Sequence, residues 1–168
     1  TLAAAEVAVE EETTIISYAC SSPELTTYDD GQDRPNGNGF LWRTTHSDAW
    51  PAESAADYVI GMGLDADTGA AIYRTDDALG DNLSAAFSDR MGGTVCGDVS
   101  FTPGTIGATH TVVDCEAVVI FADATDSARI VDDLNDKGFT GQIIGNGAMD
   151  SPEFDSAVTT STDDMVIV

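Results

Sequence analysis

The stretch Ala117-Val118-Val119-Ile120-Phe121 is a continuous apolar run, and it decides the fold class. Such a run suits a strand that is buried on both faces, at the centre of a parallel sheet. A helix is expected after it, at about residues 126–137, because Ile130, Val131 and Leu134 share one helix face. A buried strand followed by an amphipathic helix is the repeating unit of α/β proteins.

The same alternation of helix and short apolar run extends from about Ser47 to the end of the chain. A helix that Ser47 or Asp48 caps is expected to be ended by Gly61 and Gly63. The remaining expected elements are strands at 70–73, 95–101, 143–144 and 165–168 and a helix at 78–91. The sequence therefore predicts an α/β fold, a Rossmann-like three-layer αβα lobe with a mainly parallel sheet.

The first 46 residues follow a different pattern. An acidic helix is expected over Ala3 to Glu12 and a strand over Thr14 to Tyr18, before a long loop rich in Pro, Gly, Asp and Asn. One strand and one helix cannot form a core of their own. This segment is therefore expected to belong to something larger.

The chain of 168 residues carries 30 acidic and 6 basic side chains, a formal net charge of −24. This charge excludes nucleic-acid binding through a basic face. A high-salt habitat is the simplest explanation, because salt screens the repulsion among so many carboxylates. A cation-binding surface and an acidic face that meets a basic partner are the alternatives. The acidic loop at 29–39 fits a calcium loop poorly, because Arg34 stands where the first Asp of an EF-hand belongs.

Three cysteines cannot all pair within the chain, and their spacing fits no zinc pattern. A disulfide between Cys96 and Cys115, each near the start of an expected strand, would suit an extracellular protein. The alternative is three small buried residues. His46 and His110 stand in no metal or triad pattern, so no catalytic residue, metal or cofactor is expected.

Several segments, in this order, carry a family resemblance. They are TIISYACSSPELT at 14–26, FLWRT at 40–44, AIYRTDDALG at 71–80, VSFTPGT at 99–105, EAVVIF at 116–121 and GFTGQIIG at 138–145. Together they resemble the extracellular ligand-binding receptors of the branched-chain amino acid type, the periplasmic-binding-protein type I family. No single segment is specific, but the ordered series covers nearly the whole chain.

The resemblance implies a bilobed protein that closes around a small polar solute, amino-acid-like in class, and delivers it to an ABC permease. Residues 1–42 would be the tail of lobe I with the ligand loop and the approach to the hinge, and 43–168 would be lobe II. The chain would then be a piece of a longer extracellular, periplasmic or cell-surface protein without enzymatic activity. A lipid anchor would belong to a missing N-terminal part, and the start of the chain looks mature, trimmed or truncated.

The resemblance also assigns ligand-binding residues. Cys20, Ser21 and Ser22 match the family's ligand loop, where backbone N–H groups and a hydroxyl meet a ligand carboxylate; alternatively, the two serines and Pro23 cap the next helical turn. Asp48 matches an acid that faces a ligand ammonium, and its alternative role is to cap the following helix.

Three further positions depart from the family's amino-acid binders. Leu79 stands where an aromatic residue is frequent, Ala124 where Tyr is frequent, and Gly147 where an acid is common. Leu79 and Ala124 remain the expected ligand contacts of lobe II. The departures leave two rival functions open: the ligand-sensing ectodomain of a receptor or regulator, and a surface or assembly protein that kept the fold without the ligand.

Overall fold

The structure is a computed structural model of the chain and describes residues 2–30, 39–64, 69–93, 95–106 and 115–168. The chain divides into two compact units, Thr1–Trp50 and Pro51–Val168. The sequence placed the division between its two lobe segments at residues 42 and 43, inside the first of these units. The assignment of the segments to two lobes of a larger protein stays a prediction.

The first unit has its own small hydrophobic cluster. It contains α1 (Leu2–Glu10), β1 (Ile15–Ser17), α2 (Glu24–Thr27) and β2 (Leu41–Arg43). β1 and β2 pair in parallel, and Ala5, Leu25 and Leu41 are buried together against them. α2 is the helical turn that one interpretation of the sequence placed after Pro23, whereas β2 was not expected, and the two supply the partners that one strand and one helix lack.

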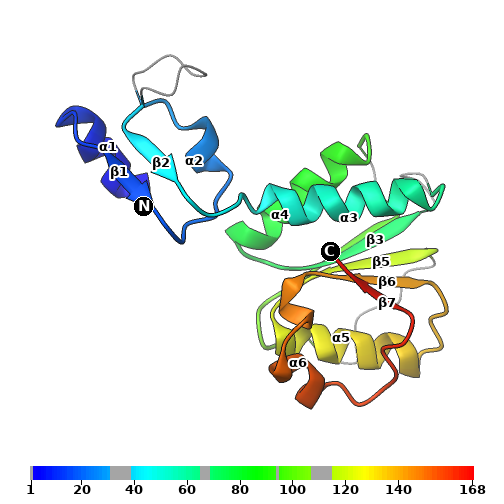
Figure 1. Ribbon diagram of the computed structural model, residues 1–168. Coiled ribbons are helices and arrows are strands. Elements are labelled where there is room, and N and C mark those ends of the chain that lie inside the picture. Colours follow the sequence, from blue (N-terminus) through cyan, green and yellow to red (C-terminus); the bar gives the residue numbers. More distant parts are fainter. Residues whose placement is uncertain (1, 31–38, 65–68, 94, 107–114) are drawn as a thin grey trace. The chain divides into compact units, whose positions relative to one another are not determined.

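The second unit is built on one five-stranded parallel sheet (Figure 1). Its strands follow the spatial order β4-β3-β5-β6-β7, and every neighbouring pair is parallel. The strand bounds are β3 Ala70–Thr75, β4 Gly97–Phe101, β5 Ala117–Phe121, β6 Gln142–Gly145 and β7 Met165–Ile167. The apolar run at 117–121 is the central strand and all five of its residues are buried, as predicted.

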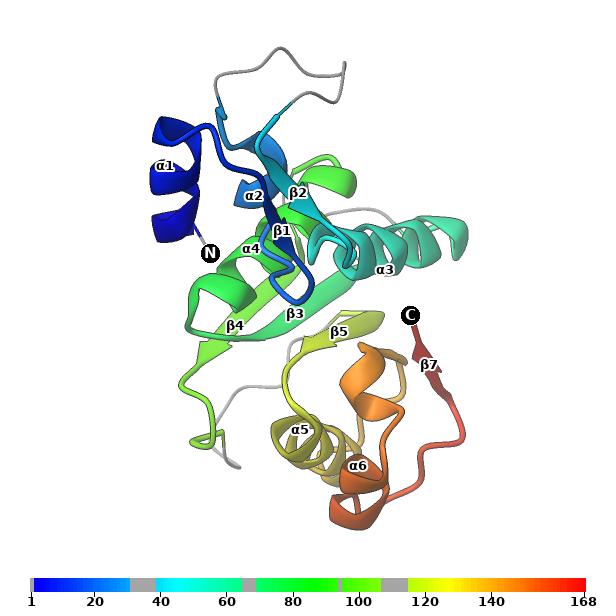
Figure 2. The same ribbon diagram turned by 60° about the vertical axis from the view of Figure 1, so that its left-hand side comes forward.

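Helices cover both faces of this sheet, which confirms the three-layer αβα prediction. α3 (Ala49–Gly61) and α4 (Ala78–Arg90) lie on one face, whereas α5 (Ala124–Asp136) and α6 (Pro152–Ala157) lie on the other. Figure 2 shows α5 and α6 side by side on that second face. Residues alternate along β3: Ile72 joins the cluster under α3 and α4, and Tyr73 joins the cluster under α5 and α6.

The expected helix faces and helix ends are confirmed in this unit. The alanines of α3 at positions 52, 55 and 56 and Val59 are fully buried, as are Ile130, Val131 and Leu134 of α5. Gly138 follows α5 with a φ of 76°, a backbone conformation that favours glycine.

Cys96 and Cys115 form a disulfide with a Cα–Cα distance of 6.1 Å, while Cys20 is the free cysteine of the described chain. The two bonded residues precede β4 and β5, the strands on either side of β3. The bond therefore connects two strands that do not pair with each other, at the amino edge of the sheet. The structure therefore confirms the expected disulfide between Cys96 and Cys115, and these two residues are not merely small buried side chains.

Two expectations lie largely outside the described residues. Residues 31–38 of the loop compared with a calcium site, and residues 107–114 of the crossover expected over 102–116, are not among those that the structure describes. Before that gap, Thr102 to Ile106 form a turn in which Gly104 has a φ of 79°. Among the helices of the described ranges, none has the length and apolar character to span a membrane.

Candidate functional site

The carboxyl edge of the sheet in the second unit is the place where the topology favours a site. β3 is followed by α4 on one face, and β5 by α5 on the other, although β3 and β5 are neighbours. Their loops therefore diverge, which makes this edge a topological switch point of the kind where open α/β sheets bind ligands. The N-termini of α4 and α5, which carry partial positive charge, both lie at it.

Leu79 and Ala124, the two residues that the sequence assigned to this unit, stand on either side of the switch point. Leu79 is in the first turn of α4, and its side chain is 49% exposed although it is large and apolar. Ala124 is the first residue of α5 and is partly buried. The structure thus places both expected contacts at one edge, 45 positions apart in sequence.

Hydrogen bonds to Asp77 hold the turn that carries Leu79. Asp77 caps α4: its Oδ1 accepts from the Gly80 N–H at 2.9 Å and from the Thr75 hydroxyl at 2.9 Å. The Gly80 N–H first, and then the Thr75 hydroxyl, lower the pKa of Asp77 although burial opposes them. A Cβ on Gly80 would overlap the Thr75 carbonyl oxygen, so only glycine lets the helix approach the strand this closely.

The neighbouring strand ends are joined to this edge by polar side chains. The Thr102 hydroxyl after β4 donates to Asp76 Oδ2 at 2.8 Å. Asn146 after β6 donates to the Ala122 carbonyl oxygen at 3.1 Å, and its own Oδ1 accepts from the Ala148 N–H at 3.0 Å. Gly147 lies exposed in the 3₁₀ turn η1 (Gly147–Met149) that Asn146 starts. Hydrogen bonds between polar groups therefore connect the strand ends along this edge.

In the first unit, the loop at Cys20, Ser21 and Ser22 is fixed through its backbone. Arg43 Nη1 donates to the carbonyl oxygens of Ser21 at 3.1 Å and Ser22 at 2.9 Å. Pro23 is the N-cap of α2 and no side chain caps that helix, so the two serine hydroxyls do not serve as its cap. The cationic guanidinium beside the loop favours an anion there.

Asp48 is tied to the same loop, because its backbone N–H donates to the Ser21 carbonyl oxygen at 2.9 Å. The side chain that accepts from the first residue of α3 is Ser47, through a bond of 3.4 Å from the Ala49 N–H. Within the described chain, no hydrogen bond of the Asp48 carboxylate is recorded. Both interpretations of its side chain, a partner for a ligand ammonium and a cap of α3, stay predictions. His46, two residues before, is exposed.

The structure thus brings Cys20, Ser21, Ser22 and Asp48 together in the first unit, and Leu79 and Ala124 at one edge in the second. Sequence reasoning missed Arg43, which organises the first group, and Asn146, which joins two strand ends of the second. Arg43 stood inside a quoted segment, but its carbonyl partners lie more than 20 positions away. No local signal identifies such a contact.

A cavity of about 300 Å³ lies elsewhere, at the amino ends of β6 and β7. Asn135, Phe139, Gln142 and Asp164 are among its lining residues. The amides of Asn135 and Gln142 already donate to backbone or side-chain oxygens of the same unit. It holds none of the expected ligand residues. Groups of three or more metal-ligating side chains are not found in the described ranges.

Comparison with known proteins places this geometry in context. No protein-family model matches the chain. Over 169 residues it is 27% identical to the chemotactic signal transduction system substrate-binding protein BasB of Halobacterium salinarum, covering 95% of this chain and 40% of that protein.

Solved structures give a stronger likeness. A putative branched-chain amino acid ABC transporter from Rhodospirillum rubrum matches with a TM-score of 0.72 at 17% identity, over 98% of this chain and 46% of that one. The leucine binding protein LivK from Thermotoga maritima matches with a TM-score of 0.66 at 22% identity, over 93% and 44%. These relatives are substrate-binding proteins, not enzymes.

The likenesses confirm the fold that the sequence predicted, that of the type I periplasmic binding proteins. The chain spans less than half the length of the relatives that it matches.

Proposed function

We propose that this chain is part of an extracellular solute-binding protein that captures a small polar solute of the amino-acid class for an ABC-type transporter. The observation that carries the proposal is the switch point of the second unit, which presents Leu79 and the start of α5 at the carboxyl edge of a substrate-binding fold. The disulfide supports an extracytoplasmic location, because such bonds persist in oxidising compartments.

Taken separately, the two units each carry groups of a kind that binds such a solute. In the first unit, Ser21 and Ser22 offer N–H groups and hydroxyls to a carboxylate, while the Cys20 N–H already donates to the Ser17 hydroxyl oxygen at 3.1 Å. Asp48 offers a carboxylate to an ammonium. A desolvated zwitterion needs hydrogen-bonded partners for both of its charges. In the second unit, exposed Leu79 offers an apolar surface to the side chain of the solute. Ala124, at the start of α5 on the same edge, adds only a small side chain.

A second candidate is solute sensing, with a signalling partner in place of the permease. It is favoured by one observation, the likeness over 95% of this chain to a protein whose name places it in a chemotactic signal transduction system. Both candidates use the same solute site and differ in what receives the loaded protein. Membrane subunits of a permease and a lipid anchor on the longer chain belong to the first candidate.

The test begins with the natural protein that contains this chain, purified in high salt. Small molecules released by denaturation are identified by mass spectrometry, and equilibrium dialysis then measures the affinity for L-leucine. Leu79→Asp is expected to weaken solute binding about tenfold or more, since it places a charge against an apolar group. Ile60→Asp is the matched control, because Ile60 is 46% exposed on α3 and plays no part in the site.

Release of a small polar metabolite, together with loss of binding in Leu79→Asp and not in the control, would support the proposal. A protein that releases nothing and binds none of a panel of amino acids would refute solute capture and favour the assembly role. Chemical crosslinking of the loaded protein in native membranes separates the two candidates: permease subunits mark transport, and a signal transducer marks sensing.

A further inference from the structure

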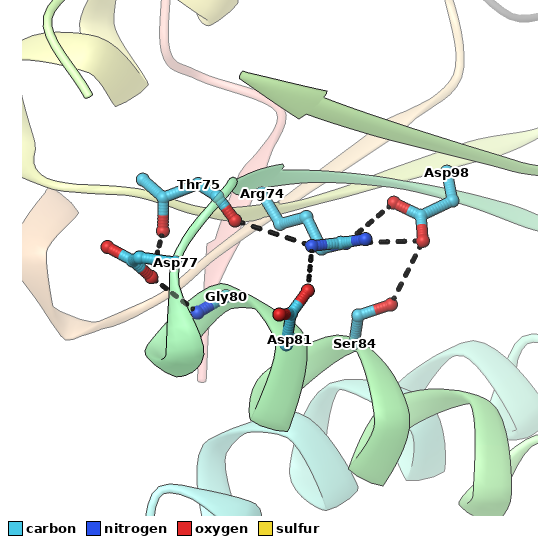
Figure 3. A network of polar contacts seen from close by, with 7 residues as sticks. All are labelled: Arg74, Thr75, Asp77, Gly80, Asp81, Ser84 and Asp98. Atoms are coloured by element: carbon cyan, nitrogen blue, oxygen red, sulfur yellow. Dashed lines mark hydrogen bonds and ion pairs between the residues drawn. The ribbon is translucent and has the colours of Figure 1, made fainter. Parts of the chain in front are cut away.

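One arginine joins three elements next to the candidate site (Figure 3). Arg74 lies on β3, and its side chain is only 17% exposed. Its Nε donates to both carboxylate oxygens of Asp98 on β4, at 2.9 and 3.2 Å, and its Nη1 donates to Asp81 of α4 at 2.5 Å. Nη1 also lies 3.4 Å from the Thr75 carbonyl oxygen, at the end of β3.

The charges around Arg74 make it hard to replace. Asp81 and Asp98 share the single charge of Arg74, and this group of three side chains is net negative even with the arginine present. Other cations are scarce, because the chain has only 6 basic side chains against 30 acidic ones. Ser84 of α4 donates to the same Asp98 at 3.3 Å, which brings that carboxylate to the helix. Burial alone would lower the pKa of Arg74, but Asp98 and Asp81 raise it above its ordinary value. Without the guanidinium, like charges would repel the start of α4 from the sheet.

The position of Asp81 gives this contact a consequence for the site. Asp77 and Gly80 attach one side of the first turn of α4 to the end of β3, and Arg74 attaches the next residue, Asp81. Leu79 lies between these attachment points, and most other large apolar residues of this unit are buried. Its exposed side chain therefore takes its direction from a turn that is held at both ends.

We infer that Arg74 is a positioning residue, which holds the first turn of α4 against β3 and β4 and thereby orients Leu79 at the carboxyl edge. The role of Leu79 as a solute contact rests on the proposed function. The attachment of the turn is a property of this chain and can be measured without a solute.

The test measures amide hydrogen exchange in the 168-residue chain by NMR. The N–H groups of Gly80 and Asp81 are both hydrogen-bonded, to the side chain and to the carbonyl oxygen of Asp77. In Arg74→Ala their exchange is expected to accelerate about tenfold or more, because charge-assisted hydrogen bonds are lost. Amides of the central strand β5 should change by less than about twofold, since local opening does not involve the core.

Two further variants define the role. Arg90→Ala removes an exposed arginine that pairs with Asp57 near the other end of α4, and it should leave the Gly80 and Asp81 amides unchanged. Arg74→Lys keeps the charge but not the planar fork, and it should restore part of the protection. In the natural protein, Arg74→Ala should also weaken L-leucine binding, whereas Arg90→Ala should not.

Unchanged exchange at Gly80 and Asp81 in Arg74→Ala would overturn the inference. Equal acceleration there and in β5 would overturn it as well, because the arginine would then act on global stability alone. If the natural protein with its native sequence binds no amino acid, the proposed function fails, but the exchange experiment still decides whether Arg74 positions the turn.

Discussion

Removal of the Cys96–Cys115 disulfide is expected to lower the free energy of unfolding of the second unit by about 3 kcal/mol. The bond joins residues 19 positions apart, and a crosslink that closes a loop of this length restricts the unfolded chain by about that much. Alanine is the suitable replacement, because Cys115 is buried and a serine hydroxyl there would need a hydrogen-bond partner.

The assay must report chiefly on the second unit. Tryptophan fluorescence is unsuitable, because Trp42 lies in the first unit and Trp50 is 66% exposed in the first turn of α3. Far-UV circular dichroism is suitable, because α3 to α6 contain most of the helical residues of the described chain. Urea at constant high salt is the suitable denaturant, since guanidinium chloride would itself screen the charge of −24.

Reduction of the native chain provides the control. A reducing phosphine should bring the native chain to the stability of the Cys96→Ala/Cys115→Ala variant and should leave that variant unchanged. A loss below about 1 kcal/mol in the variant would refute the loop-closure reasoning, which predicts a loss near 3 kcal/mol. An effect of the phosphine on the variant would show that another site is being reduced.

Three other outcomes are expected, each read from urea unfolding followed by circular dichroism. Gly80→Ala should destabilise the chain by about 1–3 kcal/mol through overlap with the Thr75 carbonyl oxygen, whereas Gly61→Ala, which meets no neighbour, should be neutral or stabilising; equal effects would contradict the overlap. Asp132→Asn should cost about 1–2 kcal/mol at neutral pH, because the Asp132 carboxylate accepts five hydrogen bonds from the N–H and hydroxyl groups of Thr159 and Thr160. Burial raises the pKa of Asp132, but these hydrogen bonds outweigh it and lower the pKa. The stabilisation that Asp132 gives is therefore present above about pH 4 and is lost as the pH falls through the lowered pKa. A difference in the free energy of unfolding between native chain and variant that persists at about pH 2 would contradict this. Raising KCl from about 0.1 to about 1 M should increase stability, because the screening length falls from about 10 to about 3 Å; a fall in stability would show that self-repulsion does not limit this chain.

The second unit was largely predictable because its inner strands β3 and β5 are buried on both faces. β5 reads as an uninterrupted apolar run for that reason, and β4, at the edge, alternates. Helix ends at Gly61 and Gly138 follow from local chemistry that a sequence displays directly. In the first unit, β2 has only three residues, and its assignment depends on pairing with β1 across a long loop.

The candidate site was harder to predict from the sequence, because its side chains are held by hydrogen bonds to residues far away in the chain. Arg74 meets Asp98 across 24 positions, and Arg43 meets Ser21 across 22. In a chain with 30 acidic residues, no spacing rule selects which carboxylate an arginine will meet. The positions of Leu79 and Ala124 came from a family resemblance, and only the strand order shows why they share an edge.

The strand order also constrains how the second unit assembles. Among the described strands of this sheet, β3 precedes the others in the chain, and it lies between β4 and β5. Neither β4 nor β5 has its native partner on that side until β3 is present. The sheet can therefore grow outward from β3 during synthesis. A circular permutant that moves β3 to the C-terminus would leave β4 and β5 without their shared neighbour until the end of synthesis, and it should fold more slowly and aggregate more readily.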